Sequence, residues 1–146
     1  MQNWRRLFWL GVMKRMAKNR KLGMGLDLLL TGGEVSGRAE DVDIIRVREI
    51  MNQALKQDED GHFLEAYFLY RQIIELLPDK SGAVRKDDAQ IFSQALNNAA
   101  IILFEHGEVE KSCLYLERSL SVQTDNQVAA SNLEQIKFSI ISNKGG

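Results

Sequence analysis

The sequence predicts an all-α fold in which antiparallel helix-turn-helix repeats stack as a short right-handed α-solenoid. Only one of the 146 residues is proline, and leucine, alanine and long polar residues are common, which favours helix over sheet. The stretch from Gly61 to Pro78 begins at a turn glycine, carries apolar residues at helical spacing and ends at that proline. A similar pattern returns 46 residues later, from Gly107 to Val122. Repetition of one helical unit is typical of a stacked architecture.

Three segments are expected. Residues 1–38 form a basic and apolar arm with short helices and a glycine-rich linker, residues 39–142 a helical repeat domain, and residues 143–146 a disordered tail. The net charge is −1, but the first 26 residues contain no acid, whereas the rest has 12 Lys/Arg and 20 Asp/Glu. A basic arm on an acidic body is therefore predicted. The basic residues of the arm are Arg5, Arg6, Lys14, Arg15, Lys18, Arg20 and Lys21.

The arm has several interpretations that the sequence leaves open. Its arginine-rich, acid-free composition is typical of a mitochondrial presequence, although the helical projection of residues 4–18 is not cleanly amphipathic. Trp4, Phe8 and Trp9 alternate with arginines and could stack on bases, so both a membrane surface and a nucleic acid are candidate partners. The apolar runs are too short to cross a bilayer, and the run at residues 7–13 is followed by Lys14 and Arg15 and not by a small-residue cleavage site.

The repeat domain begins with a helix predicted from Asp41 to the region 56–60, where apolar residues recur every three or four positions. Gly61 supplies the turn that ends it. The second helix is predicted from His62 to Leu77, and Pro78 prevents its continuation because proline lacks a backbone N–H. The inner face of this second helix is predicted to consist of Phe63, Ala66, Tyr70, Ile73 and Leu77.

A polar segment over residues 79–88 precedes a third helix, predicted at roughly 86–105. Gly107 ends it, and a fourth helix follows over residues 109–122. Thr124 or Asp125 is expected to cap the last helix, which runs to about residue 141. The packing face of this last helix is predicted to consist of Ala129, Leu133, Ile136 and Ile140.

The two helical pairs align at a single offset of 46 residues, and their pattern resembles the tetratricopeptide repeat family. That family's pattern of roughly 34 residues has small residues on both helices, a glycine at the turn, an aromatic on the second helix and a final proline. Residues 47–80 match this pattern with Ala54, Gly61, Ala66, Tyr70 and Pro78. Residues 93–126 match it more loosely, with Ala100, Gly107, Ser112, Leu116 and Thr124.

The resemblance also implies what lies outside the two repeats. Relative to the family's spacing, twelve extra residues fall at 81–92, which implies an extension of the second repeat's first helix. Residues 127–141 resemble the helix that caps such arrays. The resemblance covers about two thirds of the chain and is specific for fold rather than for function.

The family's fold implies a groove that binds a peptide or a helix. Asn52, Asn98 and Asn132 fall where family members place an asparagine that contacts a peptide backbone, since an amide both donates and accepts. The cations of carboxylate-binding co-chaperone repeats are missing, so a chaperone-tail ligand is not expected. An apolar floor with amides suits an apolar peptide or an amphipathic helix. The predicted groove residues are Arg48, Met51, Asn52, Leu55, Gln94, Asn97, Asn98, Ile101, Phe104, Ser131 and Asn132.

The chain itself contains apolar segments that fit this description, at residues 7–10 and 26–30. We therefore expect that the arm docks in or beside its own groove. Deletion of residues 1–38 would then change both the stability of the repeat domain and its partner binding.

No catalytic residue, metal site or cofactor is predicted. The sequence lacks a zinc-protease motif, a Ser-His-Asp pattern and the Gly-Lys-Ser/Thr of a phosphate-binding loop. His62 and His106 flank the turn glycines, but no third metal ligand can be named. Cys113 is expected to pack beside Ser112, because nothing near it in sequence would lower its pKa.

These observations favour a non-enzymatic scaffold or adaptor that binds a protein partner through a peptide or a helix. The alternative is a structural subunit of a larger complex, including an organellar one, anchored by the arm. A weaker alternative is a nucleic-acid- or ribosome-associated factor. We expect an intracellular and cytoplasmic protein, with a mitochondrial location as the alternative, and the single Cys113 fits a reducing compartment.

Overall fold

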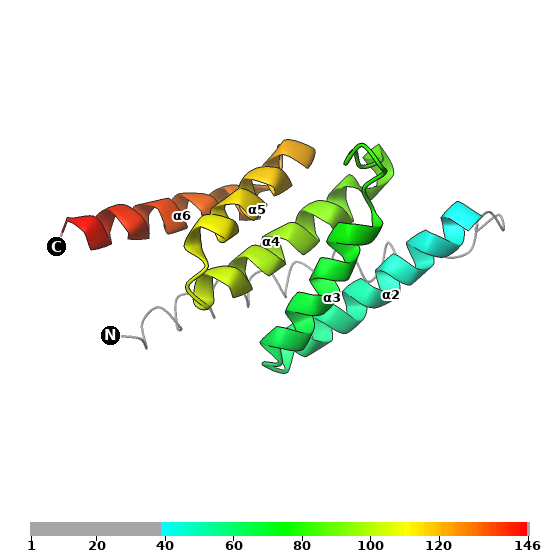
Figure 1. Ribbon diagram of the computed structural model, residues 1–146, viewed down its shortest axis with the longest axis horizontal. Coiled ribbons are helices and arrows are strands. Elements are labelled where there is room, and N and C mark those ends of the chain that lie inside the picture. Colours follow the sequence, from blue (N-terminus) through cyan, green and yellow to red (C-terminus); the bar gives the residue numbers. More distant parts are fainter. Residues whose placement is uncertain (1–38, 146) are drawn as a thin grey trace. The chain divides into compact units, whose positions relative to one another are not determined.

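The computed structural model describes residues 39–145, with side chains from residue 44 onward. These residues form only helices and connecting turns, which confirms the prediction of an all-α fold (Figure 1). Among the described residues, no helix has the length and apolar character needed to cross a membrane. The elements are α2 (Ala39–Glu59), α3 (Phe63–Leu76), the 3-10 turn η1 (Lys86–Asp88), α4 (Ala89–Glu105), α5 (Val109–Val122) and α6 (Gln127–Lys144).

The chain divides into two units inside α2, and each unit is described by itself. Only residues 39–48 of the first unit are described, and in them Val47 is buried while Ile45 is 40% exposed. The predictions for residues 1–38, including the basic arm and its docking, lie outside the described residues. The second unit is Glu49–Gly146, and it contains the rest of α2 and the four helices that follow.

Two tight turns in the second unit have the same backbone structure. Gly61 and Gly107 have φ angles of +82° and +86°, a left-handed conformation that glycine adopts without steric cost. In both turns the glycine N–H donates to the carbonyl three residues earlier, at 3.1 Å and 3.0 Å. The next N–H donates to the carbonyl five residues before it, at 2.8 Å and 2.9 Å. The helices after these turns, α3 and α5, both have 14 residues, so the predicted 46-residue offset holds for the backbone.

Helix α4 is the centre of the second unit. It contacts α3, α5 and α6, and Figure 1 shows it between α3 and α5. Twelve of its 17 residues are buried, because its apolar residues occupy most of its circumference. Phe92 and Leu96 are fully buried, and each such side chain stabilises the fold by roughly 1.5–3 kcal/mol relative to exposure.

Small residues allow α4 and α5 to pack closely. The hydroxyl of Ser112 on α5 donates to the carbonyl of Ala100 on α4 at 2.7 Å. Further along, the hydroxyls of Ser93 and Ser119 lie 2.6 Å apart, and each also reaches the other residue's carbonyl. All four residues are fully buried, so these hydrogen bonds satisfy hydroxyls that would otherwise lose their contact with water.

The connection between α3 and α4 differs from the predicted helix extension. Most of the twelve extra residues precede α4, which begins only at Ala89 after the η1 turn. The carboxylate of Asp79 accepts hydrogen bonds from the Ser81 N–H at 2.8 Å, the Ser81 hydroxyl at 2.6 Å and the Ala83 N–H at 3.1 Å. These hydrogen bonds, above all that from the Ser81 hydroxyl, hold the pKa of Asp79 below its usual value. Gly82 has a left-handed backbone with a φ of +84°, which a right-handed helix does not contain, and the Asp79 N–H donates to the carbonyl of Ala83 at 2.9 Å, so a closed loop replaces the extension.

Helix α6 starts at Gln127, as the resemblance implied, but its capping residue differs from those predicted. Asn126 caps it, since its side chain accepts from the Ala129 N–H at 3.1 Å, and neither Thr124 nor Asp125 does so. The same Asn126 donates to the hydroxyl of Ser93 at 2.9 Å, which ties the cap to α4. At its other end α6 continues to Lys144, so its last turn includes residues that the sequence placed in the tail.

Candidate functional site

The predicted groove residues fall on three helices. Those on α2 are split between the units, since Arg48 ends the first unit and the other three belong to the second. Within the second unit, Met51 is fully buried and Asn52 is exposed. On α4, Ile101 is only 1% exposed. The groove residues thus include buried packing residues as well as polar ones.

Five amide side chains lie on α4 and α6: Asn97 and Asn132 are hydrogen-bonded to each other, and the other three lie within three positions of one of these two along the same helix. We call them the amide cluster, and its members are Gln94, Asn97, Asn98, Asn132 and Gln135. Asn132 donates from Nδ2 to Oδ1 of Asn97 at 2.9 Å, a contact between residues 35 positions apart. Asn97 in turn donates from Nδ2 to Oδ1 of Asn98 at 3.4 Å. The cluster therefore links the two helices through one side-chain hydrogen bond.

Sequence reasoning named four members of the cluster and missed Gln135. A signal was present, because Gln135 lies three residues after Asn132 and so shares a helix face with it. Its Nε2 donates to the hydroxyl of the predicted residue Ser131 at 3.4 Å.

The three predicted asparagines do not have equivalent environments. Asn98 and Asn132 are 3% and 1% exposed. Asn52 on α2 is exposed. Of the three predicted asparagines, the two on α4 and α6 are therefore buried and the one on α2 is exposed.

The cluster has more hydrogen-bonding capacity than the described residues use. One donor, Nδ2 of Asn98, and two acceptors, Oε1 of Gln94 and Oε1 of Gln135, are buried without a partner among the described residues. Buried polar groups are nearly always hydrogen-bonded, because an unmade bond costs about 1–3 kcal/mol. This concentration of unused amide atoms distinguishes the cluster from the rest of the described core.

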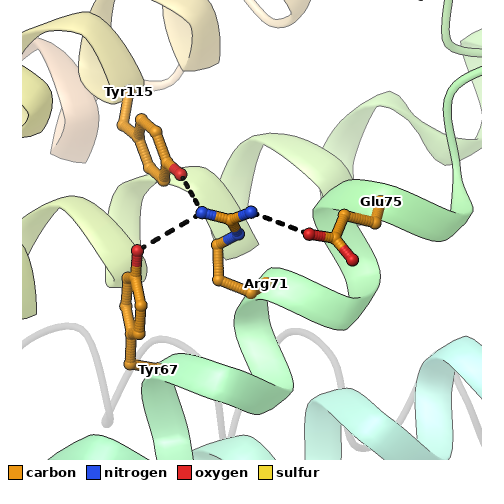
Figure 2. Close-up of polar contacts among 4 residues, drawn as sticks. All are labelled: Tyr67, Arg71, Glu75 and Tyr115. Carbon is orange, nitrogen blue, oxygen red and sulfur yellow. Dashed lines mark hydrogen bonds and ion pairs between the residues drawn. The ribbon is translucent and has the colours of Figure 1, made fainter.

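A second polar cluster joins α3 to α5, and Figure 2 shows its geometry. We call it the Tyr–Arg cluster, and it consists of Tyr67, Arg71, Glu75 and Tyr115. Nη1 of Arg71 donates to the phenol oxygens of Tyr115 at 3.0 Å and Tyr67 at 3.5 Å (Figure 2). Its Nη2 donates to Oε1 of Glu75 at 2.7 Å. Nζ of Lys111 lies 5.9 Å from the ring centroid of Tyr115.

The Tyr–Arg cluster shifts the pKa values of its members in different directions. Burial alone would raise the pKa of Tyr67, but hydrogen bonds with Arg71 and Tyr115 and the nearby positive charges lower it overall. Burial raises the pKa of Tyr115, and a charge on Tyr67 raises it further. Hydrogen bonds to Glu75 and Tyr67 raise the pKa of Arg71, which therefore stays charged. The cluster is a charged link between two helices that are not consecutive in sequence.

The histidines and the cysteine have local roles in the structure. Nδ1 of His62 lies 2.8 Å from Oε1 of Gln57, and Nδ1 of His106 lies 2.8 Å from the carbonyl of Ile102. Burial and the charge of a nearby glutamate raise the pKa of the Cys113 thiol, the opposite of the change that activates a nucleophile. In the part of the chain that the structure describes, no three His, Cys, Asp or Glu side chains are grouped to hold a metal ion.

Comparison with known proteins gives no relative. No family model matches the chain, and no curated protein or solved structure shows significant similarity to it.

Proposed function

We propose that this chain is a non-enzymatic adaptor of the tetratricopeptide type, which binds a peptide or a helix of a protein partner across α2, α4 and α6. The repeated turns at Gly61 and Gly107 support the repeat assignment. So do the small residues Ala66 and Ser112, fully buried at equivalent positions of α3 and α5. In this proposal α2–α3 and α4–α5 are two repeats stacked as a short solenoid, and α6 is the capping helix.

The amide cluster is the observation that carries the binding proposal. A peptide backbone has one N–H and one C=O per residue, so it has the groups that would pair with Nδ2 of Asn98 and with Oε1 of Gln94 or Gln135, provided that the side chains covering these buried atoms move aside on binding. An extended peptide presents these groups, whereas a helix uses most of its own internally. The unused atoms thus favour an extended ligand over a helical one.

A selection from a displayed random-peptide library, performed on the full chain, tests this proposal. Enriched peptides should bind with micromolar dissociation constants and weaken about tenfold or more in Asn98→Ala, since a bonded amide contributes roughly 1–3 kcal/mol when buried. Gln72→Ala is the matched control, because this exposed amide on α3 lies outside the cluster. Failure to enrich any peptide, or equal binding by Asn98→Ala and the parent chain, contradicts the proposal.

A permanent structural subunit is the second candidate, and exposed apolar side chains favour it. Leu64 and Phe68 lie one turn apart on α3 and are 62% and 58% exposed. Phe138 and Ile141 on α6 are 71% and 70% exposed. Adjacent exposed apolar residues are typical of surfaces that are covered in an assembly. Such a subunit would co-purify with its partner at fixed stoichiometry, whereas an adaptor would exchange its ligands.

A further inference from the structure

Helix α6 has apolar residues on two opposite faces. One face packs against the body of the second unit, where Ala129 and Ile136 are fully buried. The other face carries Phe138 and Ile141, the most exposed large apolar side chains among the described residues. At about 100° per residue, these two lie on the side of the helix away from the buried pair.

This outer face departs from what a terminal helix of a repeat array requires. Terminal helices normally have a polar outer face, which keeps the array soluble. Single exposed apolar residues are common on protein surfaces, but Phe138 and Ile141 are three positions apart and therefore adjacent on the helix. Two side chains that are 71% and 70% exposed form a continuous apolar strip. We call Glu134, Phe138, Ile141 and Gly145, which share this face, the α6 strip.

We propose that a second copy of this chain covers the α6 strip, with the two α6 helices antiparallel about a twofold axis. In this arrangement Phe138 of each copy packs against Ile141 of the other. The interface is isologous, so each contact occurs twice. The inference does not depend on the proposed peptide binding, because it uses no member of the amide cluster.

The charges of α6 favour a second copy in this orientation. Glu134 lies at one end of the α6 strip and Lys144 lies beside its other end, and both are exposed. When Phe138 lies opposite Ile141 of the second copy, Glu134 lies opposite residues 144–145 of that copy. A parallel pairing would instead place each charge against its own equivalent, which is repulsive.

The same charges argue against a partner of a single charge sign. The α6 strip has an acid at one end and a base beside the other, so in an antiparallel pair the acid of each copy faces the base of the other. A partner with a strongly positive or strongly negative surface would be attracted to one end of the strip and repelled by the other. Lys137 is already paired within the chain, since its Nζ lies 3.7 Å from Oε1 of Glu117. The strip involves one helix only and so offers less than the roughly 800 Å² per partner of a standard stable interface, which gives a weak, concentration-dependent dimer.

Sedimentation equilibrium of the full chain over about 1 µM to 1 mM tests the proposal, a range that covers weak association. The average mass should rise from 16.6 kDa toward twice that value.

Phe138→Asp should weaken dimerisation about tenfold or more, as expected for a central apolar contact. Leu114→Asp is the matched control, since it adds the same charge at an apolar residue that is 62% exposed on α5, and it should leave the dimer intact. Circular dichroism melting confirms that both variants fold.

Charge reversal tests the antiparallel register. Glu134→Lys and Lys144→Glu should each weaken the dimer, and the double variant should restore it to within about threefold of the parent chain, since opposite charges then face each other again. A mass of 16.6 kDa at every concentration overturns the proposal. So does a dimer that Leu114→Asp disrupts and Phe138→Asp does not. A double variant as weak as either single one overturns the antiparallel pairing.

Discussion

The two helix pairs of the second unit have the same turns and different interiors. The first pair is the described end of α2 with α3, and the second pair is α4 with α5. The first pair contains a buried hydrogen bond from the phenol of Tyr70 to Oδ2 of Asp58, at 2.8 Å. At the equivalent positions of the second pair, 46 residues later, the chain has Leu116 and Phe104. A phenol–carboxylate pair and an apolar pair thus occupy corresponding places.

Elsewhere the difference is reversed. In the second pair the hydroxyls of Ser112 and Ser119 bond to α4, and both residues are fully buried. Their equivalents in the first pair are Ala66 and Ile73, which are fully buried and apolar. Each pair therefore has polar bonds where the other has apolar contacts. The glycine turn and the small residues at the helix crossing fix the backbone, and the remaining interior positions can vary in chemistry.

The largest expected effect is at Leu116. Leu116→Ala should lower the free energy of unfolding by about 2–5 kcal/mol, because it removes fully buried atoms and leaves a cavity between α4 and α5. Urea denaturation followed by circular dichroism measures this loss. Leu114→Ala is the control, since Leu114 is 62% exposed and its loss should cost less than about 0.5 kcal/mol. Equal losses in the two variants would show that the second pair has no apolar core of this kind.

The corresponding change in the first pair is Tyr70→Phe. It should destabilise the chain by about 1–3 kcal/mol, because the carboxylate of Asp58 stays buried but loses this donor. A double-mutant cycle with Asp58→Ala should give a coupling energy of about 0.5–3 kcal/mol. If the two substitutions have additive effects, the 2.8 Å contact between Tyr70 and Asp58 does not stabilise the first pair. The proposed difference between the two pairs would then be wrong.

The cap of α6 extends the second pair, and Asn126→Ala tests it. The expected loss is about 1 kcal/mol, because the variant removes both the cap to the Ala129 N–H and the bond to Ser93. Thr124→Ala and Asp125→Ala should each change the stability by less than about 0.5 kcal/mol, since neither residue caps the helix. Thermal unfolding ranks the three variants, and a larger loss at Asp125 would contradict the observed cap.

A smaller effect is expected at the helix crossing. Ser112→Ala should cost about 0.5–1 kcal/mol, because it removes a 2.7 Å bond to a helix carbonyl but reproduces the alanine found at the same place in α3. Ser112→Leu should be worse by at least about 1–3 kcal/mol, since the fully buried site has no room for it. If Ser112→Leu were as stable as Ser112→Ala, the close approach of the two helices at this position would not be a feature that both pairs require.

Tyrosine ionisation gives the smallest effect and compares one residue from each pair. Tyr67 should lose its proton at lower pH than an ordinary tyrosine, and Tyr115 at higher pH, as measured by phenolate absorbance. Because the folded pKa of Tyr67 is lowered, its contribution to stability grows as pH rises through that pKa. The contribution of Tyr115 has the opposite pH dependence: it is fully present below about pH 10, the ordinary tyrosine pKa, and is lost as the pH rises through the raised folded pKa of Tyr115.

Two variants assign the transitions. Tyr115→Phe should raise the pKa of Tyr67, because one of the hydrogen bonds that lower it is lost. Tyr67→Phe should lower the pKa of Tyr115, because the neighbouring negative charge disappears. If the pKa of the remaining tyrosine is unchanged in both variants, Tyr67 and Tyr115 are not coupled.

Local sequence patterns predicted the helices well. The limits of α5 were predicted to the residue, because Gly107 marks the turn before it and the apolar spacing begins directly after. The limits of α3 were predicted within one residue, between Gly61 and Pro78. Such signals act over a few residues, and these helices obey them because no tertiary contact opposes them.

Features that depend on how helices cross could not be predicted in the same way. The contact between Arg71 and Tyr115 joins residues 44 positions apart, and no local pattern places them together. Burial of Asn98 and exposure of Asn52 follow from the different neighbours of α4 and α2, not from the two sequences, which are similar. The polar segment before α4 was predicted, but the helix extension implied for residues 81–92 was wrong over residues 81–88, where Gly82 is left-handed and Asp79 bonds the N–H groups of Ser81 and Ala83.

That loop also has a consequence for engineering. The N–H of Asp79 donates to the carbonyl of Ala83 at 2.9 Å, so the segment closes on itself with its two ends side by side. A closed, exposed loop is a point where extra sequence can be inserted at little entropic cost. The two ends of a reporter or an epitope inserted at Ser81 would therefore join the chain close together. Such an insertion should not change the orientation of α4 relative to α3.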